Sequence, residues 1–188
     1  MIDYMTIIKK YISEEEQLYD IYMSHVERVA DRAVVIAQRI GLSRLEQEFI
    51  YDAGMLHDIG VVEVYAPDIG CNGGLPYIQH LIVGKRILDE EGMPHHGNVA
   101  LRHCSPKFTM DNIKRRKIPL PEGNYLPQNI YEIIISYADL FYTKNPCYQG
   151  KCRCLEEVLP MVDRYEKGSS DEVYEYALEF GELFLPEL

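Results

Sequence analysis

Four side chains that could bind a metal ion fall on segments whose neighbours are apolar. His25 lies on the apolar stripe of a long helical pattern, and His57 and Asp58 are adjacent at the end of a second one. Asp139 lies within the apolar run IISYADLFY. Burying a carboxylate among such residues is costly unless a cation or several donors meet it. A divalent ion bound by all four residues would satisfy them together.

Each of these residues also has an ordinary structural interpretation when it is taken alone. A buried histidine is more often a hydrogen-bonded core residue than a metal ligand. Asp139 could cap a neighbouring helix or pair with an arginine, and adjacent histidine and aspartate residues are common by chance. The four together, each on a helix with an apolar face, favour the metal site.

The spacing of apolar residues predicts the two helices that carry His25, His57 and Asp58. Apolar residues that recur every three or four positions predict one helix over 18–40, with Gly41 as its stop, and a second over 45–56. Ser43 and Glu46 have the spacing of a capping box at the start of the second helix.

The same period continues along the rest of the chain. We expect further helices over 76–92, 94–103, 130–141 and, as a pair, 155–184. Residues 61–76 and 105–127 are interpreted as loops, although 61–65 could form a short strand. The sequence therefore predicts an all-α fold, an irregular helical bundle.

Composition limits the partners of the protein. With 188 residues, 47% of them hydrophobic, we expect one domain with a substantial core. The formal net charge of -11 disfavours nucleic acid but not a small phosphorylated substrate. No run of about 18 apolar residues and no secretory signal occur, so we expect a cytoplasmic protein with no membrane partner. The oligomeric state is not predicted.

The five cysteines do not predict a second metal-binding motif or a disulfide framework. Their number is odd, and the spacing of Cys147, Cys152 and Cys154 is poor for a zinc site. We expect free thiols.

The ordered set of motifs resembles the HD superfamily of metal-dependent phosphohydrolases, in particular the HDIG-type subgroup and its small uncharacterised bacterial members. The matching segments are SHVERVA (His25), AGMLHDIG (His57, Asp58), HLIVGKRIL (His80), ALRHCS (His103) and YLPQNIYEIIISYADLFYTK (Asp139). This resemblance implies one HD domain over 1–188, with a motif core over 24–144 and a C-terminal helical extension over 145–188.

The resemblance implies that the ligands of one metal ion are His25, His57, Asp58 and Asp139. Relatives with additional histidines bind two ions, with the paired aspartate as a bridge.

The additional histidines map onto His80 and His103. His96 lies seven residues before His103, so a helix would place both on one face, and we include it as a further ligand. We expect His95 at the surface. For His80, His96 and His103 the alternative is an ordinary surface or hydrogen-bonded histidine. Histidine and carboxylate ligands without cysteine suit iron, manganese, cobalt, nickel or zinc equally, so the ligand types do not choose the metal.

Basic residues near these motifs could bind the substrate's charge. Lys144, five residues after Asp139, resembles a lysine near the site in similar proteins and is the first candidate, with a catalytic role beside Asp58. Lys85, Arg86 and Arg102 are further candidates. The run 114–117 could recruit phosphate, although a solvated charged surface is the more common outcome.

The expected reaction is hydrolysis of a phosphate ester or anhydride, with a nucleotide as substrate, by attack of a metal-bound hydroxide. The G-Y-P motif of cyclic dinucleotide phosphodiesterases is absent, but the HD-type diadenosine tetraphosphate hydrolases remain open as relatives. Two alternatives remain: an HD-type di-iron oxygenase, or a catalytically silent nucleotide-binding regulatory module. The intact ligand set argues against the second.

Overall fold

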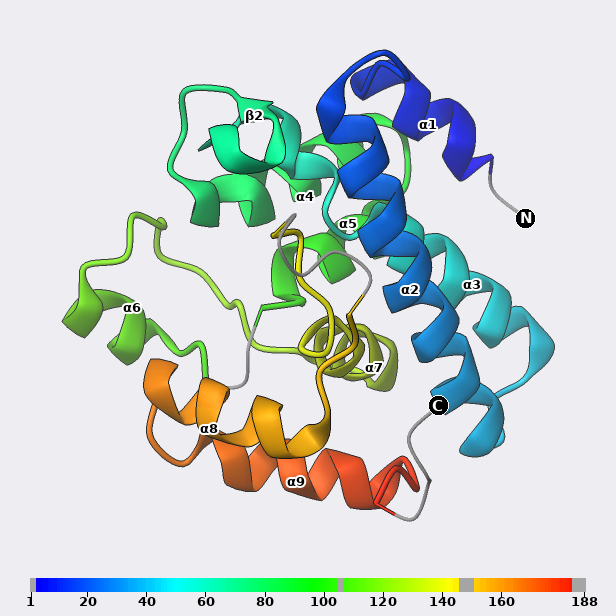
Figure 1. The fold of residues 1–188 in the computed structure, drawn as a ribbon, viewed down its shortest axis with the longest axis vertical. Helices are drawn as coiled ribbons and strands as arrows, with labels where there is room; N and C mark the ends of the chain where they lie inside the picture. The colour runs from blue at the N-terminus through cyan, green and yellow to red at the C-terminus, as the bar shows by residue number, and fades with distance from the viewer. Residues whose placement is uncertain (1–2, 105–106, 146–150, 184–188) are drawn as a thin grey trace.

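The structure is a computed structural model that describes residues 3–104, 107–145 and 151–183. Its regular structure is almost entirely helical, which confirms the all-α expectation (Figure 1). The α-helices are α1 (Tyr4–Tyr11), α2 (Gln17–Arg39), α3 (Arg44–Leu56), α4 (His80–Glu90), α5 (Pro94–Arg102), α6 (Met110–Arg116), α7 (Ile130–Asp139), α8 (Leu155–Tyr165) and α9 (Ser169–Glu179). The 3-10 helices are η1 (Ile59–Glu63), η2 (Pro67–Ile69) and η3 (Tyr77–Gln79).

The strands are two residues long. β1 (Tyr65–Ala66) pairs antiparallel with β2 (Cys71–Asn72), with Tyr65 opposite Asn72. No helix of the described residues is long and apolar enough to cross a membrane.

The C-terminal end of α2 and the N-terminal end of α3 are fixed by the residues that the sequence indicated. Gly41 follows α2 with a φ of +80°, a left-handed conformation that glycine adopts without steric cost. The Ser43 side chain accepts a hydrogen bond from the Glu46 amide, and the Glu46 carboxylate accepts one from the Ser43 amide. The predicted capping box is therefore confirmed.

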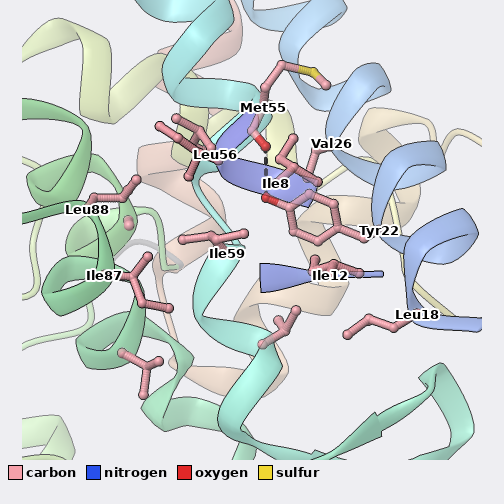
Figure 2. Close-up of a cluster of buried hydrophobic side chains, with 14 of the residues drawn as sticks. Ile8, Ile12, Leu18, Tyr22, Val26, Met55, Leu56, Ile59, Ile87 and Leu88 are labelled. Atoms are coloured by element: carbon pink, nitrogen blue, oxygen red, sulfur yellow. Dashed lines mark hydrogen bonds between the residues drawn. The ribbon is translucent and has the colours of Figure 1, made fainter. Parts of the chain in front are cut away.

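Helix α2 is the longest of the described helices, with 23 residues, and both α3 and α7 pack against it (Figure 1). One buried apolar cluster joins α1, α2, α3, η1 and α4. Figure 2 shows this cluster, in which the hydroxyl group of Tyr22 donates a 2.8 Å hydrogen bond to the carbonyl of Met55. A second cluster joins α2 and α3 to α7, α8 and α9.

Small residues let the helix pairs that carry the histidines approach closely. A Cβ atom on Gly54 of α3 would lie 2.9 Å from the Cα of Ala30 on α2. A Cβ atom on Gly84 of α4 would lie 3.1 Å from the Cβ of Ala100 on α5. These contacts hold α2 against α3 and α4 against α5. Side chains from the two helices of each pair can therefore lie close together.

Glu182 joins the C-terminal segment to α2 and α7 through side-chain contacts. Its carboxylate pairs with the Arg32 guanidinium of α2 and accepts a 2.8 Å hydrogen bond from the Tyr137 hydroxyl of α7. The side chains of Arg32 and Glu182 are 19% and 10% exposed, so the pair is largely removed from solvent. Segments far apart in the sequence are thereby joined through one carboxylate.

Three segments differ from the sequence-based expectation. Residues 110–116 form helix α6, not loop, and Thr109 caps it by accepting a 3.3 Å hydrogen bond from the Asn112 amide. Ile113 is its single buried residue, so the helix shows no apolar period in the sequence. Residues 59–63 form a 3-10 helix in place of the possible strand, and α1 was not predicted.

Candidate metal centre

The first group of potential ligands comes from four different positions in the fold. His25 lies within α2, His57 follows α3, Asp58 precedes η1, and Asp139 is the last residue of α7. One ligand atom from each lies within 4.8 Å of the others. His25 Nε2 is 3.1 Å from Asp58 Oδ2 and 3.0 Å from Asp139 Oδ1, and His57 Nε2 is 3.1 Å and 3.7 Å from the same two atoms.

The second group shares Asp58 with the first. His80, at the start of α4, and His103, just after α5, each place Nε2 3.5 Å from Asp58 Oδ1. Their two Nε2 atoms lie 3.2 Å apart. Asp58 thus turns Oδ2 toward His25 and His57 and Oδ1 toward His80 and His103, so one carboxylate borders both groups.

Three of the histidines are oriented by the same local contact. In each, ring nitrogen Nδ1 lies 2.6–2.8 Å from the main-chain carbonyl of the residue three positions earlier. The pairs are His57 with Gly54, His80 with Tyr77, and His103 with Ala100. A carbonyl can only accept, so Nδ1 carries a proton, and whenever the ring is neutral Nε2 presents its lone pair to the centre. This is the orientation that metal-binding histidines commonly have.

The inward atoms are buried polar groups whose hydrogen-bonding capacity the protein satisfies only in part. His57 and Asp58 are fully buried, and His25 is 3% exposed. Seven buried side-chain nitrogen and oxygen atoms of the described residues make no hydrogen bond, and five of them belong to these three residues, although Asp58 Oδ2 forms an ion pair with Lys144. Such groups are costly to bury unless a cation meets them.

The electrostatics of the first group also favour a cation. Burial opposes the ionisation of Asp58, but the Lys144 ammonium and His57 outweigh burial and hold the pKa of Asp58 well below its usual value. Burial likewise opposes the charged form of His57, yet Asp58 and Asp139 raise the pKa of His57 to about 10. These carboxylates therefore remain ionised and attract positive charge to the space between the rings.

In the second group the pKa of the histidine is shifted in the opposite direction. Burial, with the nearby His103 and Lys144, lowers the pKa of His80 to about 4 against the opposing effect of Asp58. His80 is therefore neutral near pH 7, and the lone pair on its Nε2 faces Nε2 of His103. A divalent ion between these nitrogens and Asp58 Oδ1 could be bound by all three atoms. The donor sets of both groups, histidine nitrogen and carboxylate oxygen, fit the borderline divalent transition metals.

Gly60 fixes the position of His80. A Cβ atom on Gly60 would lie 2.0 Å from the carbonyl oxygen of His80 and 2.4 Å from the amide nitrogen of Gly84. Only glycine permits this approach of η1 to the start of α4, and the approach brings His80 to Asp58.

The centre is exposed on the side of Asp139, whose side chain is 24% exposed. Lys144 reaches this side from beyond the end of α7, and its ammonium forms an ion pair with Asp58 Oδ2. Tyr77 of η3 borders the same side, with its ring centroid 4.9 Å from that of His80. Burial raises the pKa of its hydroxyl group, and the nearby charge of Lys144 opposes that effect. Tyr77 was not singled out from the sequence, because its proximity to Lys144 depends on tertiary structure.

His96 does not join either group, although it is buried. Its ring packs against Phe49 with centroids 4.7 Å apart, and His95 is exposed as expected. Neither group of metal-binding residues found among the described residues includes His96. We therefore leave His96 out of the ligand set that we propose.

Most of the other basic candidates pair with acidic side chains away from the centre. Lys85 pairs with Asp89, Arg86 with Glu63 and Glu90, and Arg102 with the buried Glu132. In the basic run, Lys114 pairs with Glu122 and Arg115 with Glu166, while Arg116 donates to the Tyr165 carbonyl. The idea that these residues line a phosphate-binding rim gains no support, because five of them are already paired with carboxylates and Arg116 donates to a main-chain carbonyl. Lys144 alone of the named basic candidates contacts a residue of the two groups in the described parts of the chain.

The described cysteines, Cys71, Cys104, Cys152 and Cys154, keep their thiols and form no disulfide among the described residues, as expected. Cys147 lies outside the described residues.

Two solved structures share this fold. The HD domain of the L. monocytogenes phosphodiesterase PgpH matches with a TM-score of 0.55 and 15% identity, over 100% of this chain and 90% of that domain. The same domain in complex with cyclic-di-AMP matches with a TM-score of 0.54 and 16% identity, over 96% and 98%.

A curated relative is the tRNA (cytidine(56)-2'-O)-methyltransferase of Thermoplasma volcanium. It is 27% identical over 157 residues, which are 83% of this chain and 39% of the relative. This chain thus spans about two fifths of the relative's length.

The family model described as HD domain matches residues 22–143. The matched region contains both groups of potential ligands. The chain therefore belongs to the HD domain family.

Proposed function

We propose that the protein is a metal-dependent hydrolase of a phosphate ester or anhydride, and that its substrate is a nucleotide. One observation carries the proposal: Asp58 places its two oxygens between two sets of buried histidines. A carboxylate in this position suits the bridge of a two-metal hydrolase.

The roles of the residues follow from their positions. His25, His57, Asp58 and Asp139 would hold one divalent ion, and Asp58, His80 and His103 would hold a second. Such ions lower the pKa of a bound water molecule to about 7 and polarise a phosphoryl oxygen. Iron, manganese, cobalt, nickel and zinc all suit these ligands.

Lys144 supplies a positive charge of the protein at the exposed side. Its side chain is only 13% exposed, so its charge acts in a poorly screened environment. There it would stabilise negative charge that develops on a phosphoryl group in the transition state. Asp58 would orient the attacking water molecule from the opposite side.

One comparison supports a nucleotide as substrate. A domain of similar fold has been solved with cyclic-di-AMP bound, so this architecture accommodates a nucleotide. The net charge of -11 does not exclude an anionic substrate, because a local cationic site such as the one proposed is sufficient to bind it. The segment 145–188 would act as a helical extension of one HD domain over 1–188.

The test is a hydrolysis screen with purified protein whose metal content has been measured. Nucleoside mono- and triphosphates, cyclic-di-AMP, diadenosine tetraphosphate and bis(p-nitrophenyl) phosphate are offered with each of the five metals. Asp58→Ala should abolish turnover and leave the far-ultraviolet circular dichroism unchanged. Asp68→Ala, which alters an exposed aspartate of η2, is the matched control and should retain full turnover.

Wild-type turnover by Asp58→Ala would refute the proposal. Turnover that needs molecular oxygen and a mixed-valence iron pair would assign the centre to oxygenase chemistry instead. Metal binding without turnover of any compound in the screen would favour the silent regulatory module.

A further inference from the structure

The two residues that flank His103 are both attached to helix α7. Arg102, the residue before it, donates a 3.1 Å hydrogen bond to Oε1 of Glu132 within an ion pair. Cys104, the residue after it, accepts a 3.0 Å hydrogen bond at its main-chain carbonyl from Oγ of Ser136. His103 therefore lies between two points of attachment, and neither of them uses its own side chain.

Glu132 is a rigid partner for Arg102. Its side chain is 1% exposed, and that of Arg102 is 16% exposed. Besides Arg102, the carboxylate accepts a 2.9 Å hydrogen bond from Nδ2 of Asn129 and a 2.8 Å hydrogen bond from the amide of Gln128. These two donors precede or begin α7, so they fix the orientation of the carboxylate before Arg102 reaches it. Removing the charge of one partner from such a pair is costly, because the other is left buried without its counter-charge.

Glu132 and Ser136 share a face of α7 with a residue of the first group of potential ligands. Asp139 follows them by seven and three positions, and residues at these spacings lie on one side of a helix. The same face of α7 thus carries Asp139 of the first group and anchors the chain on both sides of His103, which belongs to the second group. Helix α7 therefore relates the positions of the two groups to each other.

We propose that Glu132 and Ser136 are positioning residues for the second metal ion. Acting through Arg102 and the Cys104 carbonyl, they hold His103 where its Nε2 lies 3.5 Å from Asp58 Oδ1. The inference rests on the proposed function only in requiring the two-metal centre. Loss of either attachment would let His103 shift relative to Asp58, while the ligands of the first group keep their places.

Stepwise Mn²⁺ binding to the metal-free protein tests the proposal without any substrate. Free Mn²⁺ is measured by electron paramagnetic resonance, and the binding step that His103→Ala eliminates belongs to the second group. Ser136→Ala removes one hydrogen bond and should weaken that step about threefold to tenfold, with the other step unchanged. Glu132→Gln keeps the shape of the side chain but not its charge, and should weaken the same step at least as much.

A matched control separates positioning from general stability. The Ser170 hydroxyl donates a 2.8 Å hydrogen bond to Asp163, which joins α9 to α8, and neither of these helices carries a potential ligand. Ser170→Ala and Ser136→Ala should lower the urea midpoint to a similar extent. Only Ser136→Ala should weaken the second Mn²⁺ step. In the His103→Ala background, Ser136→Ala should leave the remaining step unchanged, because it acts through His103.

Three results would overturn the proposal. One is equal weakening of both Mn²⁺ steps by Ser136→Ala, and another is an effect of Ser136→Ala that persists in the His103→Ala background. The third is an unchanged second step in either Ser136→Ala or Glu132→Gln. A wild-type protein that binds a single ion would refute the two-metal centre and this inference with it. Failure of the hydrolysis screen alone would leave the Mn²⁺ results unaffected, so the two failures can be told apart.

Discussion

His80 and His103 face each other through their Nε2 atoms. These atoms lie 3.2 Å apart, and each ring directs Nδ1 to the carbonyl three residues earlier. The low pKa of His80, about 4, keeps that ring neutral near pH 7, so the lone pair on its Nε2 is directed at Nε2 of His103. Both nitrogens also lie 3.5 Å from Asp58 Oδ1. The pair is therefore arranged to share a cation with Asp58.

His103→Ala should remove the second metal ion and leave the first. Both nitrogens are needed to complete the second group, whereas the first group does not use them. Elemental analysis of purified protein should give two ions per chain for the wild type and one for the variant. His95→Ala, which changes an exposed histidine, should keep both ions. Two ions in His103→Ala would show that His103 is not a ligand.

Gly60→Ala should destabilise the protein and empty the second position. The new Cβ would meet the His80 carbonyl oxygen at 2.0 Å, so η1 or α4 must shift. Overpacking of this kind costs about 1–3 kcal/mol. Urea unfolding and metal analysis on the same samples provide the measurement.

Gly74→Ala is the control for Gly60→Ala, because a Cβ at Gly74 would meet no atom within 4 Å. It should preserve the midpoint of unfolding and both ions. Equal behaviour of the two variants would mean that Gly60 does not set the position of His80.

Glu182→Gln should lower stability without altering metal content. The carboxylate neutralises Arg32 in a largely buried pair and accepts from Tyr137, and an amide cannot neutralise the guanidinium. Since the pair keeps some exposure, we expect a loss of about 2 kcal/mol in the free energy of unfolding. Thermal denaturation and elemental analysis check this prediction. A variant that lost metal at full stability would place Glu182 in the function of the centre.

His96 should make stability depend on pH between about 6.5 and 4. Burial, assisted by His95, lowers the pKa of His96 to about 4 in the folded protein from its ordinary value of 6.5. The folded state thus favours the neutral ring. Its contribution is complete above pH 6.5 and is lost as the pH falls toward 4, by about 1.4 kcal/mol per pH unit at most.

The measurement for His96 is the difference in unfolding free energy between wild type and His96→Leu at several pH values. The wild type should lose stability relative to the variant as the pH falls from 6.5. A constant difference would contradict the buried neutral state of His96.

Much of the fold could be predicted because its signals are local. The period of the apolar residues predicted α2 and α3, and the spacing of Ser43 and Glu46 predicted the N-terminal cap of α3. Helix α6 was missed because it is seven residues long and buries only Ile113.

The site was predicted in part for the same reason. Residues carried by a motif, such as His57 and Asp58, can be found from the sequence together with their helices. The proximity of Tyr77 to Lys144 cannot, because 67 positions separate them and only tertiary structure brings them together. His96 shares a helical face with His103, yet it packs on Phe49, since periodicity gives a face and not the neighbour that the face meets.

The proposed bridge of two metal ions by Asp58 can be tested in a crystal structure of the metal-loaded protein. Anomalous data would be collected at the absorption edge of the metal found by elemental analysis. If Asp58 bridges two ions, two anomalous peaks per chain should lie about 3.5–4 Å apart, one contacted by Asp58 Oδ2 with His25 and His57, the other by Asp58 Oδ1 with His80 and His103. A single peak that leaves Oδ1 of Asp58 free, or no peak between these histidines, would contradict it.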